Sequence, residues 1–165
     1  MRQDIQIAPT AEEQIEGFQR CLDLVARERL YLALLQAPPL DSVKAAVLSN
    51  IADHMLRFVA LIDKQVVGWC DIRRLKHEGF QHRGELGMGV DPRYRRLGVG
   101  QQLVSHTIQK AKESGLERIE PEVFASNVAA IRLYEKMGFV TEGVKSKARK
   151  IDGTYDDIIE MALFV

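Results

Sequence analysis

The sequence predicts one mixed α/β (α+β) domain, residues 1–165, built on a single and mostly antiparallel sheet. Short runs rich in β-branched and aromatic residues alternate with helical patterns, and no linker, repeat or low-complexity segment separates them. Two pairs of strand-like runs are joined by two-residue turns, which is typical of antiparallel hairpins. The length is sufficient for one hydrophobic core. We therefore expect about four helices flanking six to seven strands.

The elements follow from periodicity and from the residues that punctuate it. Strands are expected at 4–8, 55–62, 65–74, 84–90, 119–124, 140–150 and 155–165. Helices are expected over 11–28, from Asp41 or Ser42 to about 53, from 99 to about 114, and for a short stretch after Asn127. Thr10 with Glu13 has the spacing of a capping box at the start of the first helix.

Turn residues support these boundaries. Asp63-Lys64 and Asp152-Gly153 each separate two strand-like runs, so each is expected to turn a hairpin. Gly115 follows the third helical pattern as a C′ residue, and Gly138-Phe139 is placed to end the fourth helix in a Schellman motif.

Composition narrows the function classes. Lys plus Arg and Asp plus Glu number 23 each, so no global field favours nucleic acid or a membrane surface as the main partner. Cys21 and Cys70 make no disulfide framework, and no charged segment followed by an apolar stretch opens the chain. We expect a cytoplasmic setting. The histidines lack metal-ligand spacing, so no metal site is expected.

The most informative segment is the stretch 90–101, where an apolar run ends and two glycines open a helical pattern. The first-turn amides of a helix have no intrahelical acceptor, and the peptide dipoles place roughly +0.5 charge there, so such an end binds anions. Gly98 and Gly100 leave the backbone accessible to phosphate, and Arg95 and Arg96 can add donors. An anion site is therefore predicted, although a glycine turn beside solvated arginines fits this segment equally well.

Two further motifs accompany that turn. Asn127-x-x-Ala130-x-x-Leu133-Tyr134 lies on the fourth helix, and Gly138-Phe139 closes it. Together with Arg95-x-x-Gly98-x-Gly100, and in the same order and separation, these motifs resemble the GNAT superfamily of acetyl-CoA-dependent N-acetyltransferases. The resemblance covers roughly residues 58–161. It implies the GNAT fold, in which a central parallel strand pair splays apart, with acetyl-CoA as cosubstrate and an amine as the second substrate.

The resemblance also assigns the cofactor site. The residues expected to hold the pyrophosphate are Arg95, Arg96, Leu97, Gly98, Val99, Gly100 and Gln101. Met88, Gly89 and Val90 would pair with the pantetheine arm as an extra strand does, and Asn127 and Tyr134 would lie near the thioester. Pro121 cannot donate to a ladder. Either its strand starts later than 119, or its missing amide faces the splayed gap.

Amide formation requires a base for the amine and an acid for the leaving thiolate. A phenol with a reference pKa near ~10 is close to a thiol near ~8.5, so Tyr134 is the predicted acid; its alternative role is packing on the helix. Glu85 is the first choice for the base and Glu122 the second, each directly or through water, and each could instead be a solvated strand residue. Asn127 could equally be a helix N-cap.

The expected reaction is direct attack of a primary amine on acetyl-CoA in a ternary complex. The ending Gly153-x-Tyr155-x-Asp157-x-x-x-Met161 looks like the bacterial branch that acts on amino acids and other small amines, in which the last strands often form a dimer interface, so a homodimer is possible. We expect the segment 27–32, Trp69, Asp71 and the final hairpin to shape the acceptor site. Acetylation of protein N-termini or lysines is an alternative, and so is a non-catalytic acetyl-CoA sensor.

Overall fold

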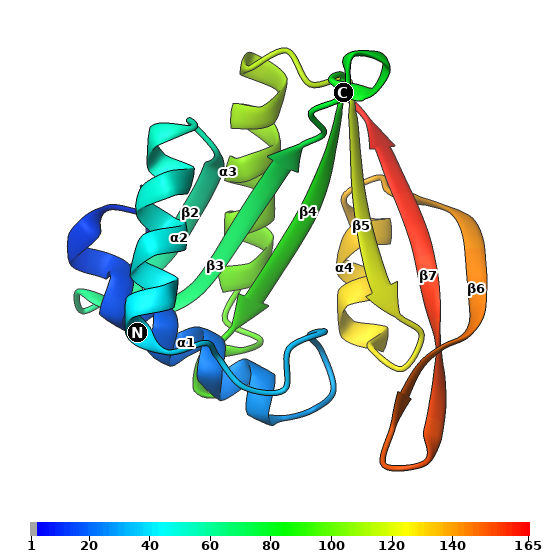
Figure 1. Cartoon of the computed structure of the whole chain (residues 1–165), viewed down its shortest axis with the longest axis horizontal. Coiled ribbons are helices and arrows are strands. Elements are labelled where there is room, and N and C mark those ends of the chain that lie inside the picture. Colours follow the sequence, from blue (N-terminus) through cyan, green and yellow to red (C-terminus); the bar gives the residue numbers. More distant parts are fainter. Residues whose placement is uncertain (1–2) are drawn as a thin grey trace.

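A computed structural model describes residues 3–165 as a seven-stranded sheet with helices on both faces (Figure 1). The strands are β1 (Gln6–Pro9), β2 (Leu56–Ile62), β3 (Gln65–Arg74), β4 (Arg83–Val90), β5 (Arg118–Phe124), β6 (Val140–Ile151) and β7 (Thr154–Phe164). The α-helices are α1 (Ile15–Arg27), α2 (Leu40–Ala52), α3 (Val99–Glu113) and α4 (Val128–Lys136). The predicted mixed fold is confirmed, with most boundaries moved by one to three residues.

The sheet has the order β1-β2-β3-β4-β5-β7-β6. All neighbouring strands are antiparallel except β4 and β5, which run parallel. Helices α1 and α2 cover one face over the first half of the sheet, and α3 and α4 lie on the other face (Figure 1). The turns at Asp63-Lys64 and Asp152-Gly153 have positive φ at both central residues, as tight hairpin turns require.

Two hydrophobic clusters hold these layers together. On one side of the sheet, Leu103 and Val104 of α3 are fully buried against Ile72 and Ile119. On the other side, Phe18 and Val25 of α1 pack with Trp69 of β3. In residues 3–165, no helix is long and apolar enough to cross a membrane.

The parallel pair separates partway along its length. Register pairs run from Arg83 opposite Arg118 to Leu86 opposite Pro121, and the ladder stops there. Beyond this point β4 and β5 diverge, as Figure 1 shows toward the lower end of both strands. Because Pro121 is the last paired residue and lacks an N–H, its missing donor falls where the ladder ends. A later start of this strand is wrong, because β5 begins at Arg118, and an orientation of the Pro121 nitrogen toward the gap stays a prediction.

The predicted capping box at the first helix is wrong. The backbone N–H of Ala11 donates to Gln14 Oε1 at 2.7 Å, so Gln14 performs the role expected of Glu13. Thr10 instead uses its backbone N–H to donate to the Arg57 carbonyl, which extends the contact of the first strand with β2. Its hydroxyl is buried without a hydrogen-bond partner. Sheet pairing therefore prevails over the local capping signal.

Candidate active site

The glycine turn connects the end of β4 to the start of α3. Asp91 caps a short 3₁₀ turn at Pro92–Tyr94, and then Arg96 and Gly98 adopt left-handed backbone angles, φ 62° and 85°. The first backbone hydrogen bond of α3 runs from Gln102 N to Gly98 O. The amides of the preceding helical residues, Val99 to Gln101, have no backbone acceptor in the described chain. The turn thus presents free donors at a helix N-terminus.

The arginines around this turn have different partners. Arg93 donates to Asp91 at 2.6 and 3.1 Å, which lowers the pKa of that carboxyl. Arg95 turns away from the free amides, donating to both carboxylate oxygens of Glu28 at 2.8 and 2.5 Å and to the Val90 carbonyl at 3.1 Å. Arg96 is exposed and makes no ion pair among the described residues. The cation available to an anion is therefore Arg96, whereas Arg95 offers its backbone.

Glu28 was not anticipated as part of this region. Glu28 follows the last residue of α1, and the helix dipole makes a carboxylate unfavourable there. The positive charge of Arg95 beside it is therefore favourable. The Arg95 guanidinium also stacks on the Tyr31 ring at 4.7 Å. No sequence signal links Glu28 to Arg95, because 67 residues separate them.

The glycines of the predicted cofactor site make room for protein side chains as well as for ligand. A Cβ on Gly89 would lie 2.2 Å from the Trp69 ring, so this glycine allows Trp69 to lie across β4. A Cβ on Gly100 would lie 3.2 Å from Met88 Cε and 3.5 Å from Leu133, which brings α4 close to the start of α3. These contacts place the start of α3 beside α4 and beside Met88, in the part of β4 that β5 no longer pairs.

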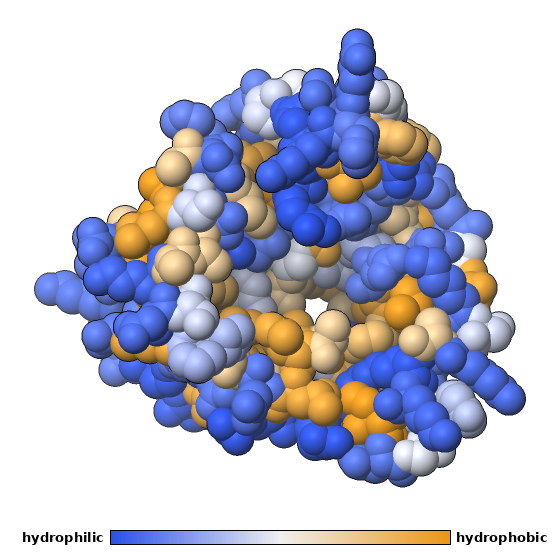
Figure 2. Space-filling model, in the orientation of Figure 1, coloured by the Kyte–Doolittle hydropathy of each residue, from blue (hydrophilic) through white to orange (hydrophobic). Residues whose placement is uncertain are grey.

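The molecule is hollowed where the strands diverge. Figure 2 shows an opening through the centre, with hydrophobic residues along its lower margin and hydrophilic ones above. After Leu86 the edge of β4 that faces β5 has no strand partner, so the backbone of residues 87–90 can pair with an extended ligand. Met88, Gly89 and Val90 all lie in this unpaired stretch.

Helix α4 carries two of the predicted site residues. Asn127 is the N-cap, and its Oδ1 accepts from Ala130 N at 3.2 Å. Tyr134 is buried and packs on Phe139 at 5.3 Å. Burial, with smaller contributions from Cys70 and Asp71, raises the pKa of the Tyr134 phenol, which therefore stays protonated at neutral pH. The predicted Schellman motif is confirmed by the bonds from Phe139 N to Tyr134 O and from Gly138 N to Glu135 O.

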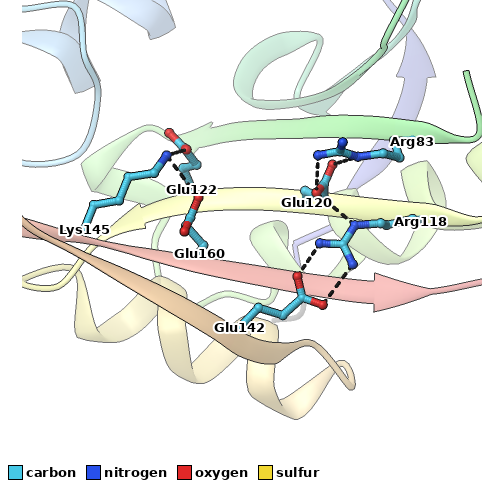
Figure 3. A network of polar contacts seen from close by, with 7 residues as sticks. All are labelled: Arg83, Arg118, Glu120, Glu122, Glu142, Lys145 and Glu160. Carbon is cyan, nitrogen blue, oxygen red and sulfur yellow. Dashed lines mark hydrogen bonds and ion pairs between the residues drawn. The ribbon is translucent and has the colours of Figure 1, made fainter. Parts of the chain in front are cut away.

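The face of β4, β5, β7 and β6 that carries no helix is covered by an ion-pair network (Figure 3). Glu120 accepts from Arg83 and Arg118 at 2.8 and 2.9 Å. Lys145 bridges Glu122 and Glu160, which come from neighbouring strands. Of the two predicted bases, Glu122 lies just past the end of the parallel ladder. Glu85 lies one residue before the last pair, is exposed, and pairs with Arg73.

The final hairpin meets the segment that follows α1. Arg149 of β6 donates to the carbonyls of Arg29 and Leu30, at 2.5 and 3.0 Å, and its guanidinium stacks on Phe124 at 4.0 Å. Arg29 in turn pairs with Asp152 at 2.9 Å. These contacts join residues 28–31 to the hairpin across the end of β5. Sequence reasoning expected both segments near the acceptor but not the residues that connect them.

The described residues offer neither a reactive thiol nor a metal site. Cys21 and Cys70 are buried, and desolvation raises both thiol pKa values, that of Cys21 to about 12. No group of three metal-ligating side chains occurs within residues 3–165. A cavity of about 410 Å³ lies at the opposite end of β3, between Asn50 and Leu116, and includes none of the predicted site residues.

The described chain thus combines a parallel strand pair that diverges with a glycine turn whose first helical amides have no backbone acceptor. A sequence profile of the acetyltransferase (GNAT) family matches residues 19–139, and the chain belongs to this family. The protein is accordingly an acetyl-CoA-dependent N-acetyltransferase.

Individual relatives agree with this assignment. The chain is 33% identical to an L-amino acid N-acetyltransferase, AaaT, of Escherichia coli K12, over 83% of this chain and 85% of that protein. It is 38% identical to a ribosomal protein bS18-alanine N-acetyltransferase of the same organism, over 47% of this chain and 53% of that protein. The structure of yncA from Salmonella typhimurium with acetyl-CoA has the same fold, with a TM-score of 0.91 at 18% identity over 97% of this chain and 93% of that one.

Proposed function

We propose that the protein transfers the acetyl group of acetyl-CoA to the primary amine of a small molecule, an amino acid or a related amine. The observation that carries this proposal is the closure of the acceptor side by Arg149, Arg29 and Asp152. Arg149 and Asp152 hold residues 29 and 30 against the hairpin there, so a slim acceptor fits more readily than a folded protein surface. The L-amino acid acetyltransferase among the relatives, which matches along most of its length, supports the same substrate class.

The donor is held, in this proposal, by the glycine turn and the free edge of β4. The amides of residues 98–101 bind the pyrophosphate, with Arg96 as the accessible cation. The unpaired backbone of residues 88–90 binds the pantetheine arm, which places the thioester between Asn127 and Tyr134. The fold supports this arrangement because it leaves both sets of donors without protein partners.

The acetyl group moves by direct attack in a ternary complex. Both cysteines are buried with raised thiol pKa values, so neither is available to carry the acetyl group. The amine nitrogen attacks the thioester carbon and the C–S bond breaks, while Tyr134, which is protonated at neutral pH, donates to the departing sulfur. Glu85 and Glu122 stay predicted bases, each with a cationic partner.

A screen for coenzyme A thiol release tests the proposal. Free amino acids, polyamines and peptides beginning with alanine are compared at equal concentration with acetyl-CoA. We expect the highest kcat/KM for a free amino acid or small amine. Higher kcat/KM for the alanine peptide would favour protein N-terminal acetylation, the reaction named for the bS18-alanine relatives. Coenzyme binding without thiol release from any acceptor would favour a sensor.

We also propose that the last hairpin forms a homodimer interface. Val144, Tyr155 and Phe164 expose 54%, 51% and 66% of their surface, which is much apolar area for one hairpin. Sedimentation equilibrium is expected to give twice the 18.7 kDa chain mass. Val144→Glu is expected to shift the protein toward monomer, and a wild-type monomer at micromolar concentration would refute the interface.

A further inference from the structure

Asp71 differs from the other carboxylates on the acceptor face of the sheet. Glu85 and Glu120 each have an arginine as a direct hydrogen-bond donor, and Glu122 shares Lys145 with Glu160. Asp71 has Arg57, whose Nε lies 3.5 Å from Oδ2, and that Nε is buried without a hydrogen-bond partner. The pair is therefore a charge contact without a well-formed hydrogen bond, and Asp71 keeps unused acceptor capacity.

The Asp71 carboxylate lies beside the point where β4 and β5 diverge. Asp71 lies opposite Gly87 of β4, the first residue past the parallel ladder. Because Gly87 has no side chain, the carboxylate lies over β4, with Oδ1 3.4 Å from where a Cβ would be. Trp69 crosses Gly89 in the same way two residues farther on. The indole and the carboxylate thus border the divergence on the face that carries α1.

The charges that act on Asp71 come from neighbouring residues of the sheet. Its own charge is the last of three causes that raise the pKa of the Tyr134 phenol, after burial and Cys70. The charged groups that act on the Asp71 carboxyl are Arg57 from β2 and Arg73 from β3, while α1 contributes the uncharged Phe18 beneath Arg57. Burial raises the pKa of the Asp71 carboxyl, and Arg57 and Arg73 only partly oppose this.

We infer that Asp71 is the base that takes the proton from the acceptor amine, and that Arg57 sets the pH at which it can do so. This inference rests on the proposed transfer to an amine. The acceptor ammonium gives one proton to the Asp71 carboxylate, and the freed nitrogen pair forms the C–N bond as the C–S bond breaks. The nitrogen loses its second proton to solvent, Tyr134 protonates the sulfur and takes a proton back from solvent, and Asp71 then releases its proton to water. The products are the amide and free coenzyme A.

The first experiment removes the charge at nearly constant shape. The pH profile of kcat/KM in the free enzyme reports the base, so the wild type should show an acidic limb above the ordinary carboxylate range. Asp71→Asn should lower kcat/KM at neutral pH by about 10²- to 10⁴-fold and abolish this limb, with coenzyme affinity retained by calorimetry. Glu142→Gln, an exposed carboxylate on β6 of the same face, is the matched control and should keep the limb.

The second experiment changes the partner and not the base. Arg57→Gln removes a charge that lowers the pKa of Asp71, so the acidic limb should move to higher pH, whereas Arg57→Lys should leave it nearly in place. This pair of variants decides the question even if Asp71→Asn does not fold. A limb that persists in Asp71→Asn, that does not move in Arg57→Gln, or that is lost in Glu85→Gln or Glu122→Gln instead, would overturn the inference. A wild type that acetylates no amine would overturn the proposed function and this inference with it.

Discussion

The packing of Trp69 across Gly89 gives a prediction that connects stability with the site. In Gly89→Ala, the new Cβ would lie 2.2 Å from Trp69 Cη2 and 2.5 Å from Cζ3, so the indole must move. Trp69 is 4% exposed and meets Phe18 edge-on at 5.6 Å, so the displacement reaches α1. Overpacking of this kind costs about 1–3 kcal/mol. For a chain of this length, each kcal/mol lowers Tm by about 2–4 °C, so a decrease of about 2–12 °C is expected.

Thermal unfolding followed by tryptophan emission measures this effect directly, because the chain contains one tryptophan. The emission maximum of native Gly89→Ala should shift as the ring leaves its site. Gly79→Ala is the control, since a Cβ there meets nothing within 4 Å. A smaller ring should relieve the clash, so the double variant with Trp69→Phe, which has no tryptophan and is followed by circular dichroism, should lose less stability than the sum of the single changes. An unchanged Tm and emission in Gly89→Ala, or full additivity in the double variant, would refute the packing argument.

Three further outcomes are expected. Arg96→Gln should weaken coenzyme A binding about 2- to 5-fold by calorimetry, more at low salt, whereas Arg93→Gln should change it less because Asp91 already holds Arg93; equal effects would contradict the assignment of Arg96 as the free cation. Tyr134→Phe should lower kcat by about 10²-fold with coenzyme affinity retained, and an unchanged kcat would mean another proton donor. Because the pKa of Asp91 is lowered in the folded state, its ionised carboxylate stabilises the fold above the unfolded pKa, and this stabilisation is lost as pH falls through the folded pKa. In Asp91→Asn, the free energy of unfolding by urea should therefore decrease less at acid pH.

Local patterns predicted the elements and the backbone conformation of the proposed donor side. The paired positive φ angles at Asp63-Lys64, the Schellman bonds at Gly138-Phe139 and the free amides after Gly98 depend on residues close together in the sequence. The capping prediction for the first helix is wrong because a distant residue intervenes: the Thr10 amide donates to the Arg57 carbonyl of β2. A capping signal describes what a segment can do alone, and tertiary pairing can offer the same amide a different acceptor.

Ion-pair partners that come from distant parts of the sequence could not be predicted from local patterns. Arg95 was expected to face an anion, but its guanidinium is held by Glu28. Glu85 was expected to be free as a base, but Arg73 on the neighbouring strand pairs with it. In both cases a charged residue found an opposite charge from another element, and nothing in the local pattern distinguishes a paired charge from an available one.

The order of the sheet explains why the two sides of the site differ in this way. The donor side is one continuous segment, because β4 runs into the glycine turn and then into α3. The proposed acceptor side combines the segment that follows α1, strand β3 and the β6–β7 hairpin, around the point where the parallel ladder ends at Leu86 and Pro121. A change in any of these separate segments can therefore alter the acceptor without disturbing the coenzyme turn. Acceptor specificity in this protein should follow from tertiary contacts such as Arg149 with Leu30, and the coenzyme from the turn itself.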